Sequence, residues 1–85
     1  MYEFKLYITG LNDQLEQSID ELKKVLKKYL NDSFKLNIID VTQMPEETES
    51  EDIFMTPTLV KVLPEPKKKV IGDISKIETI IENII

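Results

Sequence analysis

The side chains that most often perform chemistry in proteins are scarce in this sequence. The 85 residues contain no cysteine and no histidine, which excludes a disulfide and a thiol nucleophile and removes the commonest general base and metal ligand. Residues 46–52 include five carboxylates, but they lack the alternating Asp/Asn ligands and the central glycine of a calcium loop. We interpret this acidic run as a solvated face or a charged docking segment. We therefore expect no metal, no cofactor and no enzymatic activity.

A second charged group is the run of three lysines at 67–69. No aromatic residue is interleaved with them, so we interpret them as a solvated turn that discourages edge pairing rather than as a nucleic-acid patch. The net charge of −5 also argues against nucleic acid, because phosphate binding needs a net basic face. No apolar run approaches the ~20 residues that a membrane span requires, and the N-terminus has no signal pattern. The sequence predicts a single cytoplasmic domain over 1–85 that binds neither nucleic acid nor membrane.

The first half of the chain has the pattern of a strand, a helix and a second strand. Residues 2–9 alternate between apolar and polar types, which is typical of a strand. Apolar residues then follow helical spacing from 15 to 30, and Asp13 with Glu16 has capping-box spacing at the start of this helix. Residues 34–41 are the second predicted strand. Such a βαβ unit implies parallel pairing of its two strands.

The second half is punctuated by prolines. Pro45 suits the first turn of a short helix, although the acidic residues after it give that helix almost nothing to bury. Residues 58–63 and 68–72 are predicted strands whose connection is short enough for an antiparallel hairpin. Ser75 and Glu78 have the spacing of a second capping box. The apolar stripe of the last predicted helix is Ile77, Ile80, Ile81, Ile84 and Ile85.

The predicted order, β-α-β-α-β-β-α, resembles the thioredoxin fold. The segment "MTPTL" (55–59) resembles the Thr-Pro before the third strand of that fold. Pro57 by itself could simply start a strand, but the resemblance implies a cis bond between Thr56 and Pro57. The redox site of the fold would lie in the loop after the first strand, which here reads "GLNDQ" and contains no cysteine. The scaffold is therefore expected to serve binding rather than oxidoreduction.

Four segments carry a more specific resemblance. "KLYITG" (5–10), "IIDV" (38–41), "MTPTLVKVLPEPKKKVIGD" (55–73) and "DIS" (73–75) together resemble the KaiB family of circadian clock proteins and the KaiB-like sensor domain of the clock-output histidine kinase SasA. The resemblance implies a non-enzymatic adaptor that binds the ring of the hexameric ATPase KaiC, and that then captures KaiA or signals through a kinase. The alternative function is a detached sensor or regulatory module that acts on a histidine kinase.

The resemblance also implies two folds for one sequence. One is a thioredoxin-like monomer that binds partners, and the other is a tetrameric ground state with a rearranged second half. The residues expected where the two folds diverge are Pro57, Pro64, Pro66, Gly72 and Asp73. The β-branched terminal isoleucines lean toward strand, but their helical spacing leaves no clean period-two face. We therefore expect the thioredoxin-like form.

In that form the partner surface is expected at one end of the fold, where several segments converge. Its predicted residues are Tyr7, Gly10, Leu11, Gln43, Met44, Pro45, Thr56 and Pro57. Tyr7 has two interpretations, because it faces away from the apolar residues of its strand. It is either a tyrosine half packed against a neighbouring element or, as the family resemblance implies, an aromatic that contacts the partner beside the binding edge.

Overall fold

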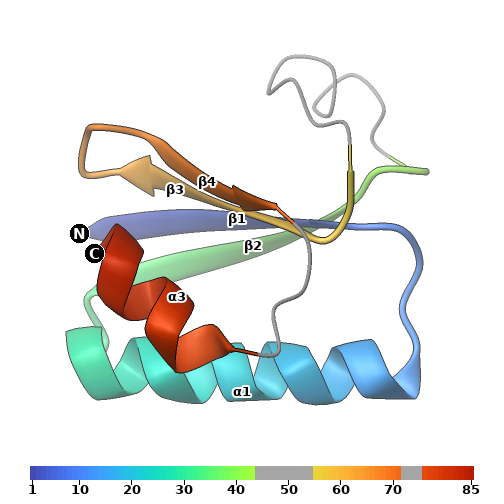
Figure 1. Cartoon of the computed structure of the whole chain (residues 1–85), viewed down its shortest axis with the longest axis horizontal. Coiled ribbons are helices and arrows are strands. Elements are labelled where there is room, and N and C mark those ends of the chain that lie inside the picture. The colour runs from blue at the N-terminus through green and yellow to red at the C-terminus, as the bar shows by residue number, and fades with distance from the viewer. Residues whose placement is uncertain (44–54, 72–75) are drawn as a thin grey trace.

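The computed structural model describes residues 1–43, 55–71 and 76–85. Its architecture is a four-stranded sheet with two helices on one face (Figure 1). The elements in chain order are β1 (Tyr2–Ile8), α1 (Asp13–Leu30), β2 (Phe34–Asp40), β3 (Thr58–Leu63), β4 (Lys68–Ile71) and α3 (Ile77–Ile84). The helix predicted after Pro45 lies outside the described residues. So do the predicted site residues Met44, Pro45, Gly72 and Asp73.

The strand order in the sheet is β2-β1-β3-β4. Strands β1 and β2 run parallel, from Tyr2 opposite Phe34 to Ile8 opposite Asp40. Strand β3 runs antiparallel to β1 and to β4. These pairings confirm the predicted βαβ unit and the predicted hairpin. They also bring the carboxyl ends of β1 and β2 to the same end of the sheet as the first residue of β3.

The main core lies between the sheet and the two helices (Figure 1). Its buried residues are Phe4, Leu6 and Ile8 from β1, Ile19, Leu22 and Leu26 from α1, Leu59 from β3, and Ile77, Ile81 and Ile84 from α3. Burial of these apolar side chains is the dominant favourable contribution to folding. The terminal isoleucines thus form a helix whose stripe faces the sheet, as their spacing predicts. A smaller cluster of Tyr7, Ile39 and Val60 lies on the opposite face of the sheet.

The helix caps differ from those that the sequence predicts. Asn12, not Asp13, caps α1: its backbone is extended, and its side-chain oxygen accepts a hydrogen bond from the Leu15 N–H at 2.8 Å. Asp13 is the first helical residue, where its negative charge complements the helix dipole. At α3 the cap position is Lys76, which makes no side-chain capping bond, and Ser75 lies outside the described residues. Glu78 instead turns toward α1.

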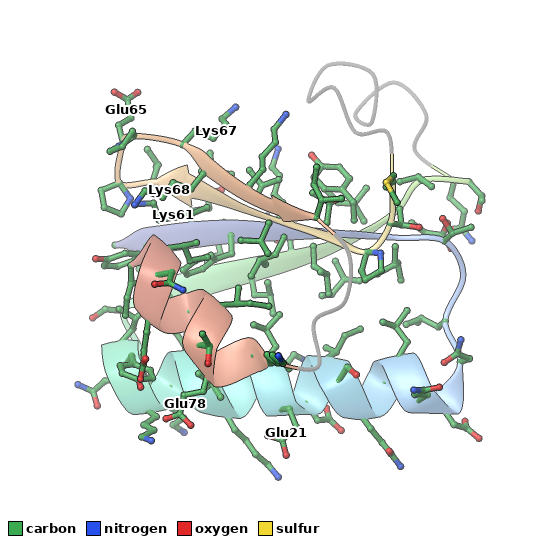
Figure 2. The ribbon with its side chains drawn as sticks, viewed as in Figure 1. Glu21, Lys61, Glu65, Lys67, Lys68 and Glu78 are labelled. Atoms are coloured by element: carbon green, nitrogen blue, oxygen red, sulfur yellow. The ribbon has the colours of Figure 1, made fainter. Side chains whose placement is uncertain are left out.

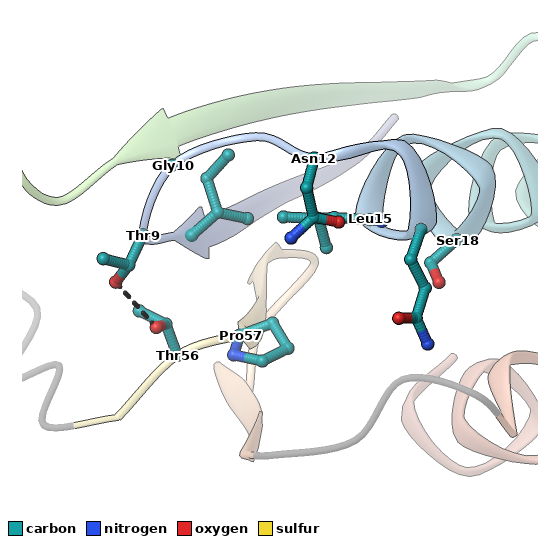
Figure 3. Close-up of a pocket in the computed structure, with 9 residues that line it drawn as sticks. Thr9, Gly10, Asn12, Leu15, Ser18, Thr56 and Pro57 are labelled. Carbon is teal, nitrogen blue, oxygen red and sulfur yellow. Dashed lines mark hydrogen bonds between the residues drawn. The ribbon is translucent and has the colours of Figure 1, made fainter.

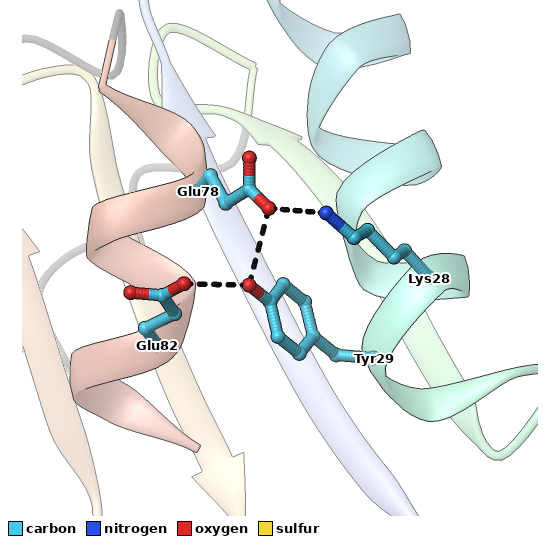
Figure 4. Close-up of polar contacts among 4 residues, drawn as sticks. All are labelled: Lys28, Tyr29, Glu78 and Glu82. Carbon is cyan, nitrogen blue, oxygen red and sulfur yellow. Dashed lines mark hydrogen bonds and ion pairs between the residues drawn. The ribbon is translucent and has the colours of Figure 1, made fainter.

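A polar cluster joins the end of α1 to α3 (Figure 4). The Glu78 carboxylate accepts hydrogen bonds from Lys28 Nζ at 2.5 Å and from the Tyr29 hydroxyl at 3.1 Å. The same hydroxyl lies 2.7 Å from Glu82 Oε1. Hydrogen bonding and charge from Glu78 raise the pKa of Lys28, while hydrogen bonds from Lys28 and Tyr29 hold the pKa of Glu78 below its ordinary value. The hydrogen bond to Glu82 is the largest cause of a raised pKa at Tyr29.

The lysine run divides between the predicted turn and the predicted strand over 68–72. Only Lys67 precedes β4, because Lys68 and Lys69 belong to that strand. All three side chains are exposed, and Figure 2 shows Lys67, Lys68 and Glu65 around the β3–β4 hairpin, on the far side of the sheet from Glu21. Strand β4 is an edge strand. Its lysines are therefore placed where charge opposes pairing with another strand.

Candidate partner-binding surface

The candidate site lies where β1 and β2 end and β3 begins. Five of the predicted residues in the described part of the chain come together here, which we name the sheet-end surface: Gly10, Leu11, Gln43, Thr56 and Pro57. Gly10 and Leu11 follow β1, Gln43 follows β2, and the Thr-Pro pair precedes β3. Gly10 contributes to both of the cavities at this end, so it lies at the centre of the surface.

The first cavity, of about 320 Å³, lies between the loop after β1, the start of α1 and the Thr56–Pro57 pair (Figure 3). Its lining residues are Ile8, Thr9, Gly10, Asn12, Gln14, Leu15, Ser18, Thr56 and Pro57. The polar members are all uncharged hydroxyls and amides. A hydroxyl becomes a nucleophile only when a base or a metal activates it, and none of these lining side chains is such a base. The cavity can donate and accept hydrogen bonds, which suits recognition.

Hydrogen bonds of threonine side chains organise the proline segment. The Thr9 and Thr56 hydroxyl oxygens lie 2.8 Å apart and connect the end of β1 to the residue before Pro57 (Figure 3). The Thr58 hydroxyl donates to the Met55 carbonyl at 2.5 Å. The Thr56–Pro57 bond is cis, which confirms the expectation from the thioredoxin resemblance, and the bonds before Pro64 and Pro66 are also cis.

The second cavity differs from the first because exposed apolar side chains line it. It has a volume of about 560 Å³ and is lined by Ile8, Gly10, Leu11, Ile38, Asp40 and Gln43. Leu11 is 57% exposed and Ile38 is 37% exposed. Large apolar side chains that stay exposed beside polar neighbours are a common composition for the centre of a protein interface. The sheet-end surface therefore combines an apolar part around Leu11 with a polar part around Thr9 and Thr56.

Asp40 is a site residue that the sequence analysis missed. It occupies the last position of β2, and its carboxylate accepts hydrogen bonds from the Thr42 hydroxyl at 2.6 Å, the Thr42 N–H at 2.9 Å and the Gly10 N–H at 3.2 Å. The bonds from Thr42, more than the bond from Gly10, lower the pKa of Asp40. The available signal was an acid placed at the end of a predicted strand, within the "IIDV" segment.

Tyr7 does not belong to this surface. Its side chain is fully buried, on the face of the sheet opposite the helices, where it packs with Ile39 and Val60. This burial supports the interpretation of Tyr7 as a packing residue. The other interpretation, an aromatic that contacts the partner, stays a prediction.

Two absences in the part of the chain that the structure describes bear on the kind of site. Within residues 1–43, 55–71 and 76–85, no group of three or more acidic side chains is placed to hold a metal ion. The acidic run at 46–52 lies outside those ranges, so its interpretation stays a prediction. None of the helices in the same ranges is long and apolar enough to cross a membrane.

Solved structures similar to this chain share its arrangement of elements. The N-terminal domain of SasA from Synechococcus elongatus matches with a TM-score of 0.72 and 21% identity, covering 96% of this chain and 80% of that one. The germline-specific thioredoxin Deadhead from Drosophila melanogaster matches with a TM-score of 0.75 and 17% identity, covering 99% and 81% of the two chains. These likenesses confirm the predicted thioredoxin-like fold.

Sequence comparison is more specific. A family model described as the KaiB domain matches residues 5–82. The circadian clock protein KaiB3 of Synechocystis sp. is 39% identical over 77 residues, which cover 91% of this chain and 76% of that protein. The circadian clock oscillator protein KaiB of Microcystis aeruginosa is 38% identical over 80 residues, which cover 94% and 77%. This chain belongs to the KaiB family.

Proposed function

We propose that this chain is a non-enzymatic clock adaptor whose sheet-end surface binds a KaiC-type hexameric ring ATPase. Membership of the KaiB family and the clock names of its relatives support a clock-related role. The observation that carries the choice of surface is the convergence of an exposed Leu11 with Gln43 and the Thr56–Pro57 pair at one end of the sheet. These residues are far apart in the sequence, and the end of the fold at which they meet is the one where the sequence analysis expects the partner surface.

Chemistry supports binding over catalysis. The whole chain contains neither cysteine nor histidine, and the cavity in the place of a thioredoxin redox site is lined by uncharged polar side chains. Threonine, asparagine and glutamine side chains can satisfy the backbone groups of a docked segment, and Leu11 offers apolar area for desolvation. These are the ingredients of an interface, with an apolar centre and a polar rim.

The family resemblance implies that this sequence adopts two different folds, and this fold switching forms part of the proposal. The thioredoxin-like state would be the monomeric, partner-binding form in the cytoplasm, and capture of KaiA would follow ATPase binding. The rearranged state would be tetrameric, with Pro57, Pro64, Pro66, Gly72 and Asp73 where the folds diverge. Size-exclusion chromatography with light scattering over a concentration series tests this part, because a tetramer and a monomer differ fourfold in mass.

A second candidate function is a regulatory module that acts on a histidine kinase. The fold it shares with the N-terminal domain of SasA favours this candidate, although a shared fold does not by itself fix a partner.

A pull-down that uses the tagged chain as bait for two kinds of partner separates the two functions. The tagged chain is incubated with the purified ring ATPase of its own organism, with and without nucleotide, and separately with the histidine kinases of that organism. Retention of the ATPase ring supports the adaptor, whereas retention of a kinase alone supports the module. Loss of both interactions would contradict the proposed function.

A further inference from the structure

Asp40 connects two loops that the strand ladder alone does not connect. The backbone pairing of β1 and β2 extends to a hydrogen bond from the Val41 N–H to the Ile8 carbonyl at 2.8 Å. The Asp40 carboxylate reaches beyond that ladder and accepts a bond from the N–H of Gly10 at 3.2 Å. One oxygen of the carboxylate is used by Thr42 and the other by Gly10. A single side chain therefore ties the loop after β1 to the turn after β2.

The Asp40 carboxylate makes local hydrogen bonds with Thr42 and a long-range hydrogen bond with Gly10. The bonds with Thr42 are local, two residues along the chain, and fix the turn that leads to Gln43, whose N–H bonds the Asp40 carbonyl at 3.0 Å. The bond with Gly10 spans 30 residues of sequence. Gly10 has a φ of +68°, and apart from Gly10 and its two chain neighbours no residue that the structure describes has an atom within 4 Å of where its Cβ would be. Backbone conformation, rather than crowding, is thus what favours glycine here.

The position of Leu11 depends on the conformation of Gly10, its neighbour in the chain. Leu11 is 57% exposed, so core packing holds only part of its side chain. A hydrogen bond to an ionised acceptor is stronger than one between neutral groups. The carboxylate of Asp40 therefore restrains the backbone that presents Leu11 beside Ile38 and Gln43, through a bond at the long end of the usual range.

We infer that Asp40 is a positioning residue of the sheet-end surface: its carboxylate holds the Gly10–Leu11 loop against the turn at Thr42, so that Leu11 is presented to the partner in a fixed place. The inference deepens the proposed function and rests on it. Asp40 acts through the loop and needs no contact with the partner. Because the loop is already held in place, it loses less conformational entropy when the partner binds.

The test compares Asp40→Ala with Thr42→Val in the full chain. The alanine variant loses both the local and the long-range contacts, whereas the valine variant loses only the hydroxyl contact and keeps the bond from Gly10. Asp40→Leu, whose side chain has no hydrogen-bonding atom, replaces the alanine variant if that protein does not fold. The chain has only two glycines, so the Gly10 amide is readily assigned in a ¹H–¹⁵N correlation spectrum.

Two readouts are taken on each protein: the shift of the Gly10 amide and the Kd for the purified ring ATPase. Loss of the carboxylate is expected to move the Gly10 amide proton upfield and to weaken binding about tenfold, the effect of one charge-assisted hydrogen bond. Thr42→Val keeps the bonds from the Thr42 N–H and the Gly10 N–H to the carboxylate, so it should change both readouts less than loss of the carboxylate does.

The outcomes separate this inference from the proposed function. An unmoved Gly10 amide in the Asp40 variants would show that the carboxylate does not hold the loop. A moved amide with an unchanged Kd would show that the loop position is irrelevant to binding. Either result overturns the inference while the native chain still binds. Failure of the native chain to bind overturns the proposed function, and the inference about the partner with it.

Discussion

The hydroxyl groups of Thr9 and Thr56 lie 2.8 Å apart, although 47 residues separate them in the sequence. This contact joins the loop after β1 to the segment that leads into β3, and both threonines line the first cavity (Figure 3). Thr56 belongs to the sheet-end surface, and Thr9 precedes Gly10 of that surface in the chain. The contact therefore helps to fix the distance between its two halves.

Thr9→Val removes this hydrogen bond while it preserves the shape of the side chain. The free energy of unfolding, measured by urea denaturation, is expected to fall by about 1 kcal/mol, the usual net contribution of one such bond. Thr9→Ser retains the hydroxyl and serves as the matched control. Because valine keeps the methyl group of threonine, an unchanged free energy of unfolding in Thr9→Val would contradict a stabilising contribution from this hydrogen bond.

The polar cluster between α1 and α3 predicts a pH-dependent contribution to stability. The pKa of Glu78 is lowered in the folded chain, first by its hydrogen bond with Lys28 and then by that with Tyr29. Stability from a lowered carboxylate pKa is present above the unfolded value, near 4.3, and is lost as pH falls through the folded value. Glu78→Gln should therefore be less stable than the native chain at neutral pH, and the difference should shrink in acid.

The control for this measurement is Glu21→Gln, which removes an exposed carboxylate from α1. Urea denaturation of the three proteins is compared at neutral pH and at several acidic values. If the free energy of unfolding of Glu78→Gln stays below that of the native chain by the same amount down to the lowest pH, the assignment of the pKa shift to this cluster is contradicted.

Docking of the terminal helix is tested by truncating its isoleucines. Ile81 is fully buried, whereas Ile85 is 37% exposed. Ile81→Ala is expected to lower the free energy of unfolding by about 2–5 kcal/mol, since it removes buried methyl and methylene groups and leaves a cavity. Ile85→Ala should have a much smaller effect. Comparable losses would mean that α3 does not pack on the sheet in the described orientation.

Much of the fold follows from local pattern in the sequence. The period of two in β1, the helical stripe of α1 and the five terminal isoleucines each predict the right element, because burial of one face dictates the spacing. The cap of α1 was assigned to Asp13 instead of Asn12, because two adjacent residues can both cap a helix and spacing alone cannot separate them.

Other features depend on tertiary contacts that spacing does not record. Lys61 is only 4% exposed and lies on the same side of β3 as Leu59, although lysine is seldom buried and a strand pattern gives no warning of it. Likewise, Glu78 fits a capping box in sequence but bonds to Lys28 on another helix. The Asp40–Gly10 contact joins two loops whose proximity follows only from the parallel pairing of β1 and β2.

The central claim is that the sheet-end surface binds a KaiC-type ring ATPase, and a matched pair of charge substitutions tests it. Leu11→Asp places a charge on this surface, and Leu63→Asp places one at the opposite end of β3, where the leucine is 43% exposed. Circular dichroism of both variants should match that of the native chain, since each leucine is exposed.

The decisive measurement is the Kd of the three proteins for the ATPase ring by isothermal titration calorimetry. We expect Leu11→Asp to weaken binding about thirtyfold or more, as for a residue at the centre of an interface, and Leu63→Asp to bind like the native chain. Equal affinities of Leu11→Asp and the native chain would contradict the assignment of this surface.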